Sequence, residues 1–297
     1  MDEVGLADAT DSRELLPGLE DQPGHLMWRA AARVTVNLAR VLPPGVDIHA
    51  YAALLTLAGG TARSQQSIAD TIDVSRTTMV KVAAQLADQG LVKRVRNPED
   101  RRSYALTRTP EGAAAARRWR RHAEDLEEAL TPGFSLGERE ELRRLLLGIL
   151  GAELAADTPE PLLESLGFLI TRVHLRMHRT FSEALGPLGI APAHFGLLTT
   201  LATLGPVPQA EVGRRLGISG ASVVQMVDHL EKRGLVERRR LEWDRRTQVL
   251  HLRPGATDAL VEARALADET LATRLGTLGV RETKRLVLLL QRFVTGE

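Results

Sequence analysis

The sequence predicts a mainly α-helical protein with small β-hairpins, built from two tandem copies of one domain. Apolar residues recur at helical spacing over most of the 297 residues. Two short runs of strand-forming residues flank the tripeptide Asp-Arg-Arg, and this arrangement occurs twice. The two tripeptides start at Asp100 and Asp244, which lie 244 − 100 = 144 residues apart.

An ungapped shift of 144 residues relates the two halves of the chain. It superposes Tyr51 on Phe195 and Ser75 on Ser219. The residues between 86 and 110 that recur identically are Leu86, Gly90, Leu91, Val92, Arg94, Arg96, Asp100, Arg101, Arg102, Leu106 and Pro110. We therefore expect a duplication, with repeats at 24–153 and 159–297 after an acidic tail at 1–23.

The composition excludes several classes of protein. Cysteine is absent, which excludes disulfide scaffolds and thiolate chemistry and indicates a reducing, cytoplasmic setting. The first 24 residues hold seven acids and one arginine without an apolar segment, so a disordered tail is expected rather than a signal peptide. No run of about 18 apolar residues suggests a membrane span.

The net charge of +1 hides two basic segments. Residues 76–108 hold eight Arg or Lys against three acids, and residues 214–253 hold ten against five. Each segment contains one Asp-Arg-Arg. This distribution is expected when one face of each domain meets a polyanion, although a solvated charged face would give the same composition.

The first repeat begins with a predicted helix at 24–42, closed by Pro-Pro-Gly. Asp47 is placed to cap the next helix, and Gly59-Gly60 to end it. Two helices follow at 64–71 and 75–89, separated by a tight turn. Their apolar positions, expected to form a three-helix core, are Ile68, Ile72, Val74, Val80, Leu86 and Leu91.

The second helix of this pair carries outward-facing polar residues, which is the helix-turn-helix pattern. Segments 91–96 and 103–108 then have strand character and are joined by a turn at 97–100. A hairpin in this place is a wing, so each repeat is predicted to be a winged helix-turn-helix domain. Two more helices, from 111 and from 135, complete the first repeat.

The second repeat retraces this order. The expected elements are helices at 160–185, 192–204, 208–216 and 219–233, strands at 235–240 and 247–252, and helices from 255 and 280.

The stretch "LGISGASVVQMVDHLEKRGLVERRRLEWDRRTQVLHLRPGA", preceded by "LGIAPAHFGLLTTLATLG", resembles the multiple antibiotic resistance regulator (MarR) family of bacterial winged-helix repressors. The first repeat matches through "LADQGLVKRVRNPEDRRSYALTRTPEG". The resemblance covers nearly all of both repeats after residue 24.

This resemblance implies homodimers whose terminal helices interlock and whose two winged helices meet successive major grooves. One chain carries both halves here, so we expect an intramolecular pseudo-dimer with a helical dimerisation-like region. Fusion gives the second half an effective concentration on the order of mM. Further homodimerisation stays open. The expected partner is a double-stranded DNA operator with unlike half-sites about one helical turn apart, because the two recognition helices differ in sequence.

The residues expected to contact DNA fall into two groups. The recognition-helix candidates are Ser75, Arg76, Thr77, Thr78, Lys81, Ser219, Gly220, Ala221, Ser222 and Gln225. The wing candidates are Arg94, Arg96, Asp100, Arg101, Arg102, Arg238, Arg240, Asp244, Arg245 and Arg246. The resemblance places Arg102 and Arg246 in the minor groove, where a cation gains from the negative potential. In the alternative, these Asp and Arg residues only tie the hairpin together.

The resemblance also implies a repressor released by a small aromatic or phenolic ligand. The candidate ligand-binding residues are Trp28, His49, Tyr51, Trp119, His174, His178, His194 and Phe195. The alternative is a core position, which a Tyr or Phe on a helix more often occupies. Trp28 corresponds to Arg172 in the repeat, so the two ligand sites are expected to differ in chemistry.

Other functions remain as alternatives. His174 and His178 have a spacing that can present two imidazoles to zinc, but a third ligand is missing, so no metal or cofactor is expected. No nucleophile, phosphate loop or paired-carboxylate motif indicates an enzyme. A ligand-binding or protein-binding module that has lost DNA binding is the remaining rival.

Overall fold

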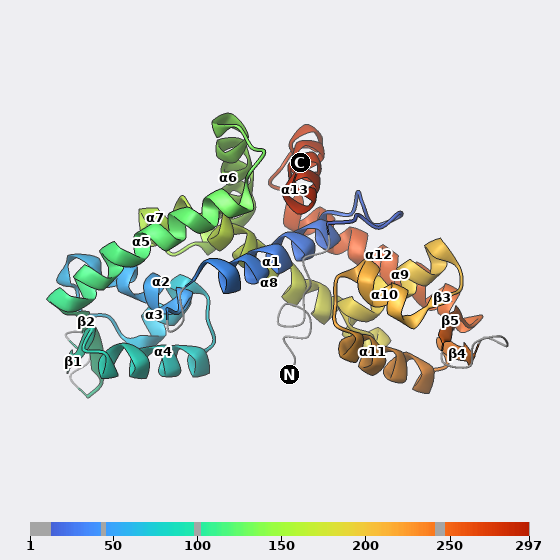
Figure 1. Cartoon of the computed structure of the whole chain (residues 1–297), viewed down its shortest axis with the longest axis horizontal. Coiled ribbons are helices and arrows are strands. Elements are labelled where there is room, and N and C mark those ends of the chain that lie inside the picture. Colours follow the sequence, from blue (N-terminus) through green and yellow to red (C-terminus); the bar gives the residue numbers. More distant parts are fainter. Residues whose placement is uncertain (1–12, 43–45, 98–101, 241–246, 297) are drawn as a thin grey trace. The chain divides into compact units, whose positions relative to one another are not determined.

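The computed structural model describes residues 13–42, 46–97, 102–240 and 247–296 (Figure 1). They form two compact units. The first-wing unit comprises Asn37–Ala129 and Leu150–Leu169, and the second-wing unit comprises Met1–Val36, Leu130–Ile149 and Ile170–Glu297. Helices α1 (Pro23–Val41) and α8 (Leu166–Leu185) contribute residues to both units.

The first-wing unit contains the first winged helix-turn-helix. Its elements are α2 (Ile48–Thr56), α3 (Gln65–Ile72), α4 (Arg76–Asp88), β1 (Val92–Arg96), β2 (Tyr104–Arg108), α5 (Pro110–Leu130) and α7 (Glu160–Leu163). Asp47 caps α2 as expected, because its carboxylate accepts a hydrogen bond from the His49 amide at 2.7 Å. Strands β1 and β2 pair antiparallel, with Val92 opposite Arg108. Arg63 forms a further bridge with Leu106.

The second-wing unit contains the second copy and the C-terminal helices of both repeats. Its elements are α6 (Leu136–Leu150), α9 (Pro192–Leu204), β3 (Val207–Pro208), α10 (Gln209–Leu216), α11 (Gly220–Lys232), β4 (Val236–Arg240), β5 (Gln248–Leu252), α12 (Gly255–Leu275) and α13 (Val280–Thr295). The sheet has the order β3-β5-β4. The two-residue strand β3 is too short to leave a period in the sequence, and it was not expected.

The duplication is visible in the element boundaries. Helices α2, α3 and α4 and strands β1 and β2 have counterparts in α9, α10, α11, β4 and β5, each beginning 144 residues later, as in 192 − 48 = 144. Helices α6 and α13 are related in the same way. They are joined within the second-wing unit by ion pairs of Arg144 with Glu282 (2.6 Å) and Arg285 with Glu141 (2.8 Å).

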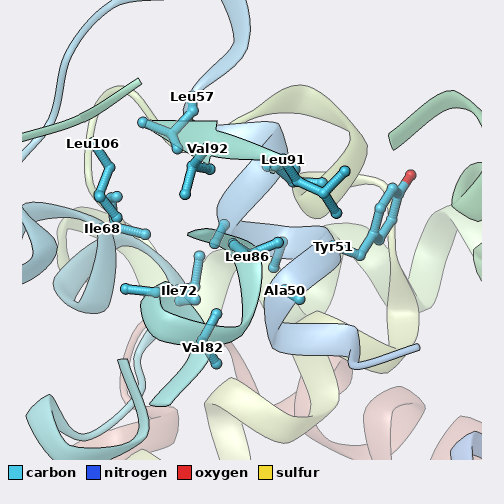
Figure 2. Packing of buried hydrophobic residues seen from close by; sticks show 14 of the residues in the cluster. Ala50, Tyr51, Leu57, Ile68, Ile72, Val82, Leu86, Leu91, Val92 and Leu106 are labelled. Carbon is cyan, nitrogen blue, oxygen red and sulfur yellow. The ribbon is translucent and has the colours of Figure 1, made fainter. Parts of the chain in front are cut away.

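The core of the first-wing unit lies between α2, α3, α4 and the hairpin (Figure 2). Ile72, Val82 and Leu86 gather there with Ala50 of α2. One expected core residue is wrong: the side chain of Val80 is 51% exposed. The buried positions of α4 are Met79, Val82, Ala83 and Leu86, a stripe spaced i, i+3, i+4 and i+7 that does not include residue 80.

Two other expectations need correction. The single helix expected at 160–185 is interrupted between α7 and α8, because Ser165 caps α8 by accepting a hydrogen bond from the Phe168 amide at 3.1 Å. Residues 13–22 of the expected disordered tail are packed in turns, with Leu16 and Leu19 buried in the second-wing unit. Residues 1–12 lie outside the described residues. The repeat boundaries at 24–153 and 159–297 stay a prediction.

Within the described residues, no single helix is long and apolar enough to cross a membrane; only the bent pair Leu166–Leu188 and Pro192–Leu204 meets that test, by length and composition alone.

Candidate nucleic-acid interface and ligand cavity

The first recognition helix, α4, presents a short polar and cationic face. Its N-cap residue Ser75 accepts a hydrogen bond from the Thr78 amide at 3.0 Å, and the two hydroxyls lie 2.8 Å apart. Burial of Met79 and its neighbours on the opposite side leaves Arg76, Thr77 and Lys81 exposed. These three predicted DNA-contact residues therefore lie together on the open side of α4.

The second recognition helix, α11, is arranged similarly but differs in chemistry. Ser219 is its N-cap and accepts a hydrogen bond from the Ser222 amide at 3.2 Å. Gly220, Ala221 and Gln225 are exposed, as expected. Ser222 is only 5% exposed and lines a cavity, so it is not available to DNA. The reason is again the helical period, because residue 222 shares the buried face with Met226.

Both recognition helices also expose a valine that the sequence analysis missed. Val80 of α4 is 51% exposed and Val224 of α11 is 42% exposed. They are equivalent positions, since 224 − 80 = 144. An exposed apolar side chain on such a face is suited to the 5-methyl group of thymine. The duplication could have indicated this exposure, because both copies have a valine at this position among residues that face outward.

Arg238 of the second wing is held inside the protein. Its guanidinium contacts Asp228 at 2.7 Å and also pairs with Glu231, and its Nε donates to Gln209 at 3.0 Å. The side chain is 17% exposed. These ion pairs tie β4 to α11, so a DNA contact by Arg238, which stays a prediction, would compete with them.

The equivalent arginine of the first wing has no such partners. Arg94 is exposed, and the residues that correspond to Asp228 and Glu231 are Ala84 and Ala87, as 228 − 144 = 84 and 231 − 144 = 87. Within the described residues, Arg94 makes no ion pair. The first wing thus has an exposed arginine, Arg94, at the position where the second wing has Arg238 paired with carboxylates.

The remaining wing candidates fall into two sets. Arg96 stacks over the exposed Tyr104 ring, with 5.2 Å from its guanidinium carbon to the ring centre, while Arg102 and Arg240 are exposed. Asp100, Arg101, Asp244, Arg245 and Arg246 lie outside the described residues.

Acidic residues also neutralise the first helix of the second helix-turn-helix. Arg214 lies 2.6 Å from both Glu14 and Glu211, and Arg215 pairs with the same two carboxylates. Hydrogen bonds from Arg214 and then Arg215 lower the pKa of Glu211 to about 2. The second helix-turn-helix therefore presents fewer unpaired cations than its arginine count suggests.

A cavity of about 140 Å³ lies within the second-wing unit. Helices α1, α8, α9, α11 and α12 line it, and four of the predicted ligand-binding residues meet there: Trp28, His174, His178 and Phe195. Phe195 stacks edge-on against Phe181, with ring centres 5.5 Å apart, and the rings of His174 and His178 are 5.6 Å apart. Trp28, a first-repeat residue, is thus grouped with residues of the second repeat.

The histidines around this cavity are neutral at pH 7. Burial is the main cause that lowers the pKa of His174 to about 3, with His178 adding a smaller repulsion. Burial, followed by the charge of Arg29, likewise lowers the pKa of His25 to about 3. The Nε2 atom of His25 is buried and has no hydrogen-bond partner within the described part of the chain. His25 was not among the predicted residues, because a single histidine beside Pro23 carries no pattern.

The other four ligand candidates lie elsewhere. Tyr51 and Trp119 pack in the core of the first-wing unit, and His49 lies 3.1 Å from Asp47 at the start of α2. His194 accepts a hydrogen bond from the Ala191 amide at 2.9 Å and stacks on His229 with ring centres 4.4 Å apart. No group of three or more metal-ligating side chains occurs among the residues that the structure describes.

Two recognition helices, each followed by an antiparallel hairpin, define a winged helix-turn-helix protein with two copies of the domain in one chain. The MarR family model matches the chain twice, at residues 45–103 and 188–247, whose ends are 247 − 103 = 144 residues apart. The chain belongs to the MarR family.

Individual relatives match about one repeat. A protein of Thauera aromatica, named as a transcriptional regulatory protein for the hcr operon, is 37% identical over 91 residues, which cover 31% of this chain and 52% of that protein. The match thus spans about half the length of this curated relative. A probable transcriptional regulator from Pseudomonas aeruginosa is 31% identical, with a TM-score of 0.40, and covers 43% of this chain and 95% of that one. The transcriptional repressor CouR, solved with a 23-mer DNA duplex, is 32% identical, with a TM-score of 0.41 and coverages of 43% and 91%.

Proposed function

We propose that the chain is a cytoplasmic transcriptional regulator that binds double-stranded DNA through two unlike winged helices, acting as a single-chain pseudo-dimer. The observation that carries this proposal is the exposed recognition face of α4 with Arg76, Thr77 and Lys81, repeated in α11 at the same offset. Side chains of this kind contact phosphates and base edges in the major groove.

The operator should have unlike half-sites. We call α3, α4, β1 and β2 the first head, and α10, α11, β4 and β5 the second head. Arg76, Lys81, Lys93 and Arg94 of the first head make no ion pair among the described residues. In the second head, Arg214, Arg215 and Arg238 are all paired with carboxylates. Among these residues the first head has more unpaired cations for phosphate, while the second head keeps the exposed Lys232 and Arg240 and adds base-edge contacts through Gln225 and Val224.

A small-molecule effector fits the cavity of the second-wing unit, and release from DNA on binding makes the protein a repressor. Ser222 and Met226 line this cavity from α11. They belong to the same helix as the exposed Val224 and Gln225, so a ligand that shifts α11 changes the face offered to DNA. Such a shift requires that the ligand bind the two conformations with different affinity.

DNA binding is tested by selecting bound fragments from genomic DNA and measuring their affinity by fluorescence anisotropy at several salt concentrations. We expect a steep fall of log K with log salt, by about 0.9 for each phosphate contact. A double variant, Arg76→Ala with Lys81→Ala, should lower both affinity and slope. The exposed pair Arg117→Ala and Arg118→Ala on α5 provides a control with the same change of charge.

A protein with no salt-dependent affinity for any selected fragment would refute this function. The rival reading, a module that has lost DNA binding, predicts that outcome together with intact ligand binding.

A further inference from the structure

The outward face of α5 carries its charges in a definite order. Its inner face packs in the first-wing core through Ala115, Ala116 and Trp119. On the opposite side, an exposed stripe with helical spacing holds three arginines followed by three acids: Arg117, Arg120, Arg121, Glu124, Asp125 and Glu128. We call these residues the α5 stripe. One half of the stripe is cationic and the other half is anionic.

Contacts within the chain leave half of the α5 stripe unpaired. Arg120 pairs with Glu124 at 2.8 Å, and the Asp125 carboxylate lies 3.9 Å from the ring of His122. The members that make no ion pair among the described residues are Arg117, Arg121 and Glu128. The two arginines of this set are four residues apart, a spacing at which like charges repel each other along a helix.

The order of charges in the α5 stripe does not serve the stability of the helix. Carboxylates are favourable near the N-terminus of a helix and cations near its C-terminus, because of the helix dipole. The equivalent helix α12 follows this rule, with Asp258 in its first turn and Arg274 in its last turn. In α5, Glu111 of the first turn follows it, but the stripe runs from arginines to acids and ends with Glu128. The order of the stripe therefore needs another explanation.

Two antiparallel copies of the α5 stripe are complementary in charge. The residue numbers 117 and 128, 120 and 125, and 121 and 124 each add to 245, so a twofold rotation places every arginine opposite a carboxylate. The resulting pairs are Arg117 with Glu128, Arg120 with Asp125, and Arg121 with Glu124. Each pair occurs twice, because an isologous interface uses the same surface of both molecules.

The second repeat does not have this order. A shift of 144 residues brings the arginine positions of the stripe onto Val261, Arg264 and Ala265. It brings the acid positions onto Asp268, Glu269 and Ala272. Of the two equivalent helices, only α5 is therefore self-complementary, and pairing through its stripe closes at two chains instead of continuing into a filament.

We propose that the α5 stripe is a self-association surface, on which α5 of a second copy of the chain docks antiparallel. Each arginine of the stripe then meets a carboxylate of the second copy, which offsets the repulsion between like charges within each helix. The contact is weak and sensitive to salt, because the side chains are exposed in the single chain, by 74% for Arg120 and 58% for Glu124. The inference is independent of DNA binding, since the stripe belongs neither to a recognition helix nor to a wing.

Sedimentation equilibrium of the full chain between about 1 μM and about 0.5 mM tests the proposal. At about 0.05 M salt, the average mass should rise with concentration from that of one chain toward that of two, and at about 0.5 M salt it should stay near that of one chain. A mass that stays at one chain throughout at the lower salt concentration, or that grows beyond two chains, would overturn the proposal.

Two charge-reversed variants test the order of the stripe. Arg117→Glu with Arg121→Glu makes the stripe mainly acidic, and Glu124→Arg with Glu128→Arg makes it mainly basic. Self-association of each variant alone should weaken by about tenfold or more, because like charges then face each other. An equimolar mixture of the two should form a one-to-one pair, because all the opposed positions are complementary again. Association of either variant alone at wild-type strength, or failure of the mixture to associate, would show the proposal to be wrong.

Two control pairs make the same changes of net charge at exposed positions outside the stripe. Arg264→Glu with Arg281→Glu matches the acidic variant, and Asp268→Arg with Glu269→Arg matches the basic one. Both controls should associate as the wild type does, and far-UV circular dichroism should show the same helix content in every variant. Loss of association in a control would assign the effect to net charge and refute the role of the stripe. Arginines that bound DNA instead would lower operator affinity in the acidic variant relative to its control without self-association, which would also refute it.

Discussion

The electrostatic difference between the two heads predicts an unusual gain of function. The double variant Asp228→Ala and Glu231→Ala places alanine in α11 where α4 has Ala84 and Ala87. It also removes both ion-pair partners of the Arg238 guanidinium. DNA affinity should rise, because a cation becomes available for phosphate and two anions leave the recognition helix.

The magnitude follows from the number of contacts. One added phosphate contact steepens the slope of log K against log salt by about 0.9, and relative to 1 M salt this tightens binding about fivefold at 0.15 M. Folding stability should fall, since Arg238 loses both ion pairs. Asp228 and Glu231 are partly exposed, so we expect a loss of only about 1–2 kcal/mol.

Fluorescence anisotropy with the selected operator, between about 0.1 and 0.4 M salt, measures both quantities. Asp268→Ala with Glu269→Ala on α12 changes the net charge equally at an exposed site on the same unit and controls for long-range effects. The reciprocal change, Ala84→Asp with Ala87→Glu, should weaken binding and flatten the slope. If the Asp228 and Glu231 double variant left affinity and slope at the wild-type values, the idea that these carboxylates withhold Arg238 from DNA would be wrong.

Three further predictions concern folding. The pKa of His174 is lowered from 6.5 to about 3, so between these pH values the imidazole is protonated in the unfolded chain but not in the folded one. The free energy of unfolding should therefore fall by about 1.4 kcal/mol per pH unit from pH 6.5 down to about pH 3. Urea unfolding at pH 7.5, 6 and 5 should show this loss of stability, and His174→Leu should reduce it. Ser219→Ala removes the N-cap of α11 and should cost about 1 kcal/mol in the same assay, whereas Ser182→Ala, in the last turns of α8, should cost much less. Gly112→Ala should destabilise by about 3 kcal/mol or more, because the new Cβ would lie 2.0 Å from the Leu91 carbonyl oxygen, while Gly137→Ala, with nothing within 4 Å, should be neutral or stabilising.

The sequence was sufficient for elements whose ends are determined locally. Asp47, Ser75 and Ser219 bond to amides two or three residues ahead, so their helix starts can be recognised from a few letters. Gly90 and Gly234 adopt positive φ values of 69° and 68° just after the two recognition helices, which is the conformation that glycine favours.

Features that depend on contacts between residues far apart in the sequence could not be predicted from it. The start of α8 depends on Glu127, which bonds to Ser165 from 38 residues away. The grouping of Trp28 with His174 and Phe195 depends on residues 23–36 of α1 belonging to the second-wing unit rather than to the first-wing unit. The ion pairs of Arg238 depend on two carboxylates of the preceding helix, and the contact of that helix with β4 is determined by packing rather than by sequence spacing.

The position of the cavity determines what a ligand can do to a two-headed complex. Ser222 and Met226 connect the cavity to α11, whereas the matching place beside the first head is filled by Phe168 and Glu127. In the proposed function, an effector bound in this cavity would act on the half-site affinity of the second head. If both heads bind one operator as proposed, fusion gives the second head an effective concentration on the order of mM, and loss of its binding would convert a bivalent complex into a monovalent one. The first head, in which Arg76, Lys81, Lys93 and Arg94 make no ion pair among the described residues, would then stay near DNA through sequence-independent contacts that salt weakens. By linkage, operator DNA must lower or raise the affinity for the effector by the same factor as the effector changes the affinity for DNA.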